Sequence, residues 1–324
     1  MLLLLLACQP TPVKDTPPLT VDSGDSSPGE STSPLDRCAA AGQALTLLDS
    51  AELNPLTSVD RLLWQDGLLA VVLGSDEIAL YDAPFDGAAP TLRSTILRYE
   101  AWEDMTFLRD GRLAASGSWS VGVWDPAGGD GVQLGGWGNN GPLWSIAATE
   151  DGFRVSSADT SALMEPVGGE PVFVAQSFDE VHLVATEGAH SWLAGVKDGQ
   201  GGLAFDLRGG YSIPAPGLSG APTGLQVFAD SVTLVSSDEV ARYDRVGTLV
   251  GTASTGDLHP GGLRASPGSR YAWTVAAGQG AVVIDDLELS LLAPSSDMLD
   301  LAVIDDWLLS GHADGTVRRW GCSL

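Results

Sequence analysis

The feature that most constrains the fold of this chain is a repeat of about 40 residues. Short strand-like runs that end in a large apolar side chain, usually followed by an acid, recur along the sequence. The large residues of these seven runs are Tyr81, Trp124, Met164, Phe205, Tyr243, Ile284 and Trp320. Their spacing varies only between 36 and 43 residues. A repeat of this length predicts an array of similar supersecondary units that stack against one another.

A turn signal precedes most of these runs at a similar distance. Asp66-Gly67 and Asp110-Gly111 each lie between apolar stretches, and Asp-Gly is typical of a hairpin because Gly readily adopts positive φ. In the second unit MTFLRDG, RLAASGS, SVGVWDP and VQLGGW read as four short strands. Four strands per unit predict the blade of a β-propeller. We therefore predict an all-β fold, a seven-bladed β-propeller with four-stranded blades. The competing all-β interpretation is one or two sandwiches.

The units resemble WD repeats in two places. One is the dipeptide Trp124-Asp125, and the other is the closing stretch SGHADGTVRRW, which ends at Trp320. The resemblance covers the chain from about Ser58 onward. The Gly-His dipeptide that opens a WD blade is missing, since Gly311-His312 falls between the second and third strands of its unit. The resemblance implies a propeller that binds a partner on one face.

The stretch MLLLLLAC resembles the end of a bacterial lipoprotein signal peptide. Leu5-Leu6-Ala7-Cys8 matches the lipobox of that family residue by residue. The resemblance implies a signal segment over residues 1–7, cleavage before Cys8 and a lipid on that cysteine. No positively charged segment precedes the apolar run, which predicts a start codon further upstream. The alternative interpretation is an ordinary apolar N-terminus with an incidental cysteine.

Residues 8–37 are dominated by Pro, Ser, Thr, Asp and Gly. Such a segment has too little apolar surface to fold, so it predicts a disordered tether that joins the lipid to a propeller over residues 38–324. No later stretch has the roughly 18 uninterrupted apolar residues of a transmembrane helix. We expect the lipid to be the only membrane attachment, and the protein to reside in the bacterial cell envelope, periplasmic or surface-exposed.

The seventh unit supplies only three strands, DLAVIDD, WLLSGHA and GTVRRWG. A closed propeller then takes its fourth strand from the N-terminal side, where GQALTLLDS, Gly42 to Ser50, is apolar. Antiparallel pairing of this stretch with GTVRRWG would bring Cys38 close to Cys322. With Cys8 assigned to lipid, these two cysteines form an even pair in a compartment that permits disulfides, and we predict a Cys38–Cys322 bond.

The chain carries a net charge of −26, from 42 acidic residues against 16 Lys and Arg. Residues 1–37 hold only two basic and five acidic residues, so most of the acid lies on the predicted propeller. A surface of this sign repels phosphate backbones, and nucleic acid is not expected as a partner. The acids are scattered along the chain, which favours a role in solubility over cation binding.

No pattern of catalytic residues stands out. The four histidines show no spacing such as His-x-x-x-His, so neither a metal site nor a cofactor is predicted. A Gly-x-Ser-x-Gly elbow and a phosphate loop are also absent from the sequence. The expected function is a binding or scaffold module that recognises a protein, peptide or glycan. The alternative is a calcium-dependent hydrolase or lactonase-type propeller enzyme, because the chain is rich in acids.

The candidate ligand contacts fall in or beside the loops that gather at one face of a propeller. These candidates are Trp102, Trp119, Trp137, Asn139, Asn140, His259 and His312. The stretch YEAWEDM adds Glu100 and Glu103 beside the first of them. Aromatic rings and adaptable amides on a rigid scaffold suit recognition of a peptide, a protein loop or a sugar. The alternative is that these tryptophans cap blade edges.

Overall fold

The computed structural model describes residues 33–83, 88–97, 101–127, 132–136, 143–157, 161–164, 172–174, 178–187, 190–207, 210–211, 215–266, 268–304 and 306–323. Apart from one short helix, the regular structure in these residues is β-strand. The described part of the chain contains no helix that is long and apolar enough to cross a membrane.

The strands pair with their sequence neighbours in antiparallel sheets, and six of these sheets have four strands. The first three along the chain are β2 (Val59–Gln65), β3 (Leu68–Leu73), β4 (Glu77–Asp82) and β5 (Thr91–Leu97); β6 (Trp102–Phe107), β7 (Leu113–Gly117), β8 (Ser120–Trp124) and β9 (Val132–Gly136); and β10 (Leu143–Ala148), β11 (Phe153–Ser157), β12 (Ser161–Met164) and β13 (Val172–Val174).

The other three four-stranded sheets lie in the second half of the chain, and the last of them borrows a strand from the N-terminal side. They are β19 (Gly224–Val227), β20 (Ser231–Val235), β21 (Glu239–Asp244) and β22 (Leu249–Ser254); β23 (Pro260–Arg264), β24 (Tyr271–Ala276), β25 (Gly280–Asp285) and β26 (Glu288–Pro294); and β27 (Met298–Ile304), β28 (Trp307–His312), β29 (Thr316–Gly321) and β1 (Thr46–Glu52).

One further sheet departs from this pattern at its outer edge. It consists of β14 (Glu180–Glu187), β15 (His190–Lys197), β16 (Gln200–Leu207), β17 (Gly210–Tyr211) and β18 (Ala215–Leu218). Both β17 and β18 pair with β16, so two short strands share the edge that one strand occupies elsewhere. Gly201 and Gly202 permit the approach of this edge, since a Cβ on Gly202 would overlap the carbonyl oxygen of Ala215 in β18, and a Cβ on Gly201 that of Gly220 just after it.

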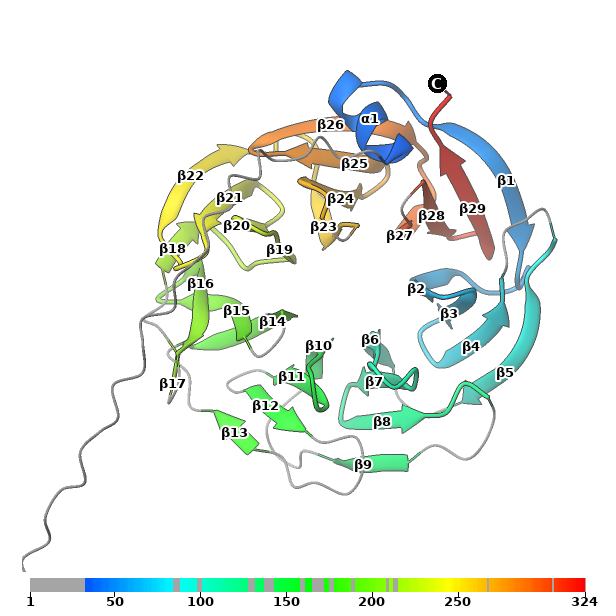
Figure 1. The fold of residues 1–324 in the computed structure, drawn as a ribbon, viewed down its shortest axis with the longest axis horizontal. Helices are drawn as coiled ribbons and strands as arrows, with labels where there is room; N and C mark the ends of the chain where they lie inside the picture. The colour runs from blue at the N-terminus through cyan, green and yellow to red at the C-terminus, as the bar shows by residue number, and fades with distance from the viewer. Residues whose placement is uncertain are drawn as a thin grey trace, which may run out of the picture. The chain divides into compact units, whose positions relative to one another are not determined.

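The first strands of the sheets form the inner ring of the molecule. In order, β2, β6, β10, β14, β19, β23 and β27 contact one another, and β27 returns to β2. Figure 1 shows the sheets arranged around a common centre in this order. The predicted β-propeller with four-stranded blades is confirmed, and six blades have the regular form.

Burial explains why the blades need one another. All residues of β7 and β8 are buried, whereas every residue of the outer strand β5 is exposed or half-buried. Hydrophobic clusters join neighbouring blades: Ile78 and Leu80 of one blade pack with Trp102, Phe107 and Trp124 of the next. A single blade would expose these faces to water, so the ring folds as a unit.

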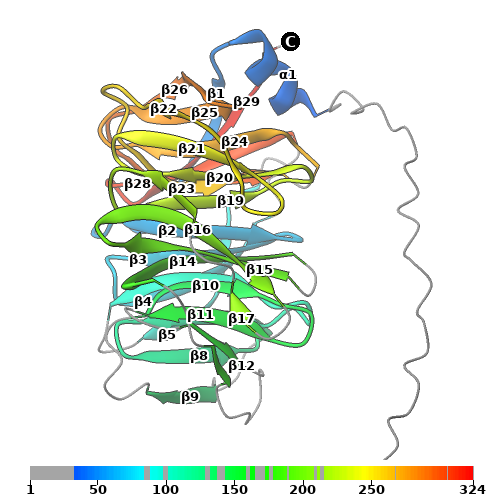
Figure 2. The same ribbon diagram turned by 90° about the vertical axis from the view of Figure 1, so that its left-hand side faces the viewer.

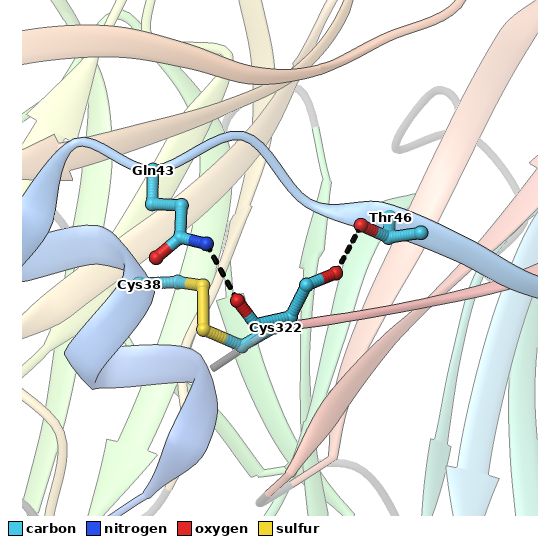
Figure 3. Close-up of a disulfide and its surroundings, with 5 residues drawn as sticks. Cys38, Gln43, Thr46 and Cys322 are labelled. Carbon is cyan, nitrogen blue, oxygen red and sulfur yellow. Dashed lines mark hydrogen bonds between the residues drawn. A yellow bond between two sulfur atoms is a disulfide. The ribbon is translucent and has the colours of Figure 1, made fainter.

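The ring closes as the sequence predicts. β1 pairs antiparallel with β29, from Thr46 opposite Gly321 to Glu52 opposite Thr316. Cys38 and Cys322 lie at disulfide distance, with Cα atoms 5.8 Å apart, and a bond joins their sulfur atoms (Figure 3). The Gln43 amide adds a hydrogen bond of 2.7 Å to the backbone oxygen of Ser323.

Helix α1 (Pro34–Ala41) begins inside the segment that was predicted to be a tether, so residues 34–37 belong to the folded structure. Pro34 stands in its first turn, and Gly42 ends it in the left-handed region with φ 59°. The helix buries Leu35 and Cys38 in the core shared by the last two blades, beside the C-terminal end of the chain (Figures 1 and 2).

Candidate functional site

Two kinds of loop share one face of the propeller. Because consecutive strands in a blade are antiparallel, the loops between second and third strands lie on the same side as the connections between blades. We call this side the interblade face. Its described loops include residues 53–58, 74–76, 118–119, 198–199, 236–238, 255–259, 277–279, 295–297 and 313–315.

A cavity of about 480 Å³ lies among the inner strands and reaches the loops of the interblade face. We call this cavity the channel mouth. Its lining side chains are mostly polar or charged, with one tryptophan; they include Arg61, Glu103, Asp104, Trp144, His259, Arg264 and Asp300. A second cavity, of about 450 Å³, follows the same inner strands and shares several of these residues.

Bulges in the inner strands place several of these side chains. The ladder between first and second strands shifts register in six of the sheets, near the start of the first strand. The shifts lie between Val59 and Arg61, Trp102 and Asp104, Leu143 and Ser145, Val181 and Leu183, Pro260 and Leu263, and Met298 and Asp300. A bulge adds one residue and re-aims its side chain. Glu103, Trp144 and Leu299 are such added residues, and all three line the channel mouth.

Two of the lining carboxylates hold adjacent blades together. Oδ2 of Asp300 accepts a hydrogen bond of 2.9 Å from the backbone N–H of Leu62. Oδ2 of Asp104 accepts bonds from the N–H of Ile146, at 3.0 Å, and from the Ser145 hydroxyl, at 3.1 Å. Inner strands have no further strand on the channel side, so these carboxylates satisfy N–H groups that the sheet leaves unpaired.

An aromatic pair lies on the β10 and β14 side of the channel mouth. The rings of Trp144 and His182 stack with centroids 4.6 Å apart and an interplanar angle of 23°. Burial lowers the pKa of His182, although Glu180, whose Oε2 lies 3.3 Å from Nε2, acts in the opposite direction. A neutral imidazole therefore backs the indole near neutral pH, and the Trp144 ring that it supports gives the channel mouth an aromatic wall.

Two of the predicted contact residues are exposed. Trp119 lies in the loop between β7 and β8 on the interblade face and is 60 % exposed. His259 lies at the edge of the channel mouth, where its Nδ1 is 3.1 Å from the backbone oxygen of Ser237. Trp137, Asn139 and Asn140 lie outside the described residues.

The other two, Trp102 and His312, are buried. The Trp102 ring meets Trp124 edge-on with centroids 5.3 Å apart, and its Nε1 donates to the backbone oxygen of Asp76 at 3.3 Å. His312 has no exposed surface. Both side chains belong to the blade core and offer no surface to a ligand in this structure, so the alternative that such tryptophans cap blade edges fits Trp102 better.

His312 takes part in a buried chain of hydrogen bonds. Trp320 Nε1 donates to the Ser310 hydroxyl at 2.7 Å, the hydroxyl lies 2.6 Å from Nε2 of His312, and Nδ1 of His312 lies 3.1 Å from Oδ1 of Asp297. The indole can only donate, which leaves the Ser310 hydrogen for Nε2. These are the residue types of a hydrolase triad, but Ser310 and His312 are inaccessible, so the chain fastens the blade.

Sequence reasoning missed Trp144, Arg61 and Arg264 as parts of the site. Trp144 and Arg61 stand at or beside the bulges that open the inner strands, and each blade contributes few lining residues. The sequence signal for these lining residues would have been a polar or aromatic side chain near the start of a predicted first strand. Their convergence depends on ring closure, which no local pattern encodes.

The described residues contain no group of three or more His, Cys, Asp or Glu side chains placed to hold a metal ion. Cys8, the predicted lipid site, lies outside the described residues.

No protein-family model matches this chain, and no curated protein matches it. The resemblances to WD repeats and to a lipoprotein signal therefore rest on the motifs quoted above.

Proposed function

We propose that this chain is a lipid-anchored recognition module of the bacterial cell envelope, which binds a peptide or protein loop at the channel mouth. In this proposal the sheet from β14 to β18 counts as a blade and makes the propeller seven-bladed. The Trp320–Ser310–His312–Asp297 chain supports a WD-like character, because it uses the four residue types that bond inside a WD blade.

The observation that carries the proposal is the composition of the channel mouth. It combines an aromatic wall, Trp144 stacked on His182, with charged groups of both signs, such as Arg264 and Glu103. A cavity of about 480 Å³ accommodates a few side chains and not a folded domain. Small cavities with an apolar wall and a few placed polar groups are typical of sites that take an extended segment or small ligand.

The charged lining favours a peptide over a neutral glycan. A neutral sugar could hydrogen-bond to the guanidinium of Arg264 and the carboxylate of Glu103 but could neutralise neither charge, and charged groups that lose water without an opposite charge weaken binding. A peptide can supply both charges together with an apolar side chain for Trp144. Trp119, exposed on the same face, would extend the contact beyond the cavity.

Crosslinking in cells, followed by purification through the propeller, tests this function. We expect a discrete protein to be recovered with the unaltered chain and lost with Trp144→Ala, and recovery to fall with Trp119→Ala. Leu92→Ala, a change of an exposed residue on the outer strand β5, is the matched control and should recover the partner. Melting curves of each variant separate lost binding from lost folding. Equal recovery from all variants would show that the channel mouth is not the recognition site.

The lipid anchor has its own test. Cells fed an alkyne fatty acid should label the unaltered protein, and Cys8→Ser should abolish the label and release the protein from the membrane fraction. Cys8→Ser protein that keeps both the label and the membrane association would contradict the anchor. The lipobox Leu5–Cys8 and the Pro/Ser-rich segment after it support this expectation.

A further inference from the structure

We propose that Arg61 and Arg264 form a carboxylate-binding pair in the channel mouth, which takes an acidic group of a bound peptide. This inference rests on the proposed function and names the chemistry of its ligand. The two arginines come from β2 and β23, and both line both of the inner cavities.

Arginines elsewhere in the described residues mostly pair with carboxylates. The pairs within 4 Å are Arg93–Asp82, Arg109–Glu150, Arg112–Asp110, Arg242–Asp230, Arg242–Asp286, Arg245–Glu187, Arg270–Asp285, Arg318–Asp297, Arg318–Asp314 and Arg319–Asp49. With 42 acidic residues against 16 Lys and Arg, carboxylates are in excess throughout this chain. A lack of carboxylates in the chain therefore does not explain why an arginine has no carboxylate partner.

Arg61 and Arg264 are two such arginines. Among the described residues neither has a carboxylate within ion-pair distance; Arg61 makes only long contacts of 3.4 Å with the backbone oxygens of Glu103 and Asp60. Nη1 of Arg264 donates to the backbone oxygen of Leu263 at 3.1 Å. A guanidinium has five N–H donors, so most of the donors of both side chains are left for a ligand or water.

The acids of the channel mouth are engaged with protein donors. Asp300 and Asp104 accept the interblade hydrogen bonds described above, and Oε1 of Glu103 accepts from the Ser118 hydroxyl at 3.3 Å. These contacts hold the carboxylates of Asp300 and Asp104 against the neighbouring blade and that of Glu103 on its own blade. The guanidinium groups of Arg61 and Arg264 have no comparable partner among the described residues, so they are the charged groups of the channel mouth that are left for a ligand.

The approach to Arg264 is left open by glycine. Gly261 and Gly262 stand at the start of β23, where other inner strands carry side chains such as Glu103 or Trp144. The only atom near a Cβ built on Gly262 is Nη1 of Arg264, at 3.7 Å. A longer side chain at this position would extend over the guanidinium, so the glycine keeps its donors accessible from the channel.

The position of the pair indicates what else the ligand carries. β23 and β2 flank β27 on one side of the ring, while β10 and β14, which hold Trp144 and His182, lie across it (Figure 1). A carboxylate held by the arginines would leave the neighbouring part of the peptide facing the aromatic wall. We therefore expect an acidic residue next to an apolar one.

The charge of the whole protein makes the test specific. At a net charge of −26 the molecule repels anions at long range, so an acidic probe gains nothing from general electrostatic attraction. Bidentate contact between a guanidinium and a carboxylate is short-range and strong enough to act against that background. Binding of an anion would thus report a local site.

Titration calorimetry on the purified full-length chain tests the pair. The probes are the peptide acetyl-Phe-Glu-Phe-amide, its Gln counterpart, and succinate. We expect the Glu peptide to bind at least tenfold more tightly than the Gln peptide, and Arg61→Gln or Arg264→Gln to remove that difference. Arg93→Gln, which changes an arginine already paired with Asp82, is the matched control and should leave binding unchanged.

The succinate arm identifies the source of the carboxylate. Succinate binding that depends on both arginines would mean that a free carboxylate suffices, and binding of the Glu peptide alone would mean that the apolar neighbour is required. Equal binding of the Glu and Gln peptides, unchanged binding in both arginine variants, or no binding of any carboxylate probe at millimolar concentration would overturn the inference.

The outcome is separable from that of the proposed function. Partner recovery that is lost with Trp144→Ala but kept with Arg61→Gln and Arg264→Gln, together with no preference for the Glu peptide, would refute the carboxylate pair and leave the recognition module standing. Arginine-dependent succinate binding without any recovered partner would support the carboxylate pair and refute the recognition module.

Discussion

Oδ1 of Asp297 lies 3.1 Å from Nδ1 of the fully buried His312, and this contact ties the connection before β27 to the end of β28. The same carboxylate accepts hydrogen bonds from Arg318 of β29, at 3.1 and 2.9 Å. Through Ser310 the chain reaches the Trp320 indole. Two strands of the closing blade, β28 and β29, and one interblade loop are therefore joined through a chain that contains a single buried imidazole.

Replacement of His312 by Ala should destabilise the protein strongly. The change removes the acceptor 2.6 Å from the Ser310 hydroxyl and one of the donors to Oδ1 of Asp297, and it opens a cavity in the blade. Each buried group left unpaired costs about 1–3 kcal/mol, so we expect a loss of roughly 3 kcal/mol in the free energy of unfolding. Urea denaturation measures it. His259→Ala, at an exposed histidine, should change the free energy of unfolding by less than about 0.5 kcal/mol.

The stability of the protein should fall as the pH drops from 7 toward 5. Burial lowers the pKa of His312 below its ordinary value of 6.5, and Arg318 lowers it further, while Asp297 and Asp314 oppose the shift without cancelling it. The unfolded chain then binds a proton in this window that the folded chain does not, so acid favours unfolding. His182, whose pKa burial also lowers, adds to the effect. His312→Ala should flatten the pH dependence; an unchanged slope would contradict this.

A second loss of stability should follow below about pH 4. Burial acts to raise the pKa of Asp297, but hydrogen bonds from Ser295, Arg318 and His312 outweigh it and hold the carboxyl well below its ordinary value of 3.8. The stabilisation is present above that value and is lost as the pH falls through the folded-state pKa. Thermal melts of the unaltered chain and Asp297→Asn at pH 6 and pH 3 measure it. The variant should be less stable at pH 6 and lose less on acidification.

Much of the fold could be predicted because its signals are local and repeated. The Asp-Gly turns and large residues such as Trp124 and Trp320 recur in every few dozen residues, so errors in one unit are corrected by the others. Ring closure through β1 followed from counting strands. Helix α1 did not, because the composition around Pro34 is that of a tether and the helix is stabilised by burial of Leu35 and Cys38.

The site was harder to predict, for a physical reason. Trp144, Arg61 and Arg264 are far apart in sequence and meet only because three blades converge on the channel. Burial decides whether a tryptophan can contact a ligand or packs in the core. Trp102 and Trp119 both lie beside loops, but Trp102 is buried and Trp119 is exposed. Sequence alone offers no signal for that difference.

Reduction of the Cys38–Cys322 bond should lower the melting temperature. The bond closes a loop of 284 residues and fixes α1 beside the last blade. In the chain-entropy model a loop of this length stabilises the fold by on the order of 5 kcal/mol, which corresponds to a shift of roughly 10 °C for a domain of this size. Cys38→Ser should reproduce the effect of reductant, and Cys8→Ser should have none. Melting curves that coincide with and without reductant would show that the bond does not form.

Asp300 should stabilise the contact between the last blade and the first. Its Oδ2 accepts from the Leu62 N–H at 2.9 Å, and β2 has no strand on its channel side to offer that N–H another partner. Asp300→Ala should therefore cost about 1–3 kcal/mol in the free energy of unfolding, whereas Asp300→Asn, whose amide oxygen can still accept, should cost less. Asp306→Ala, at an exposed acid, is the control. Equal free energies of unfolding for the Ala and Asn variants would show that an accepting oxygen at this position does not stabilise the protein. The joint between the blades would then depend on packing of residues such as Val59 and Leu309.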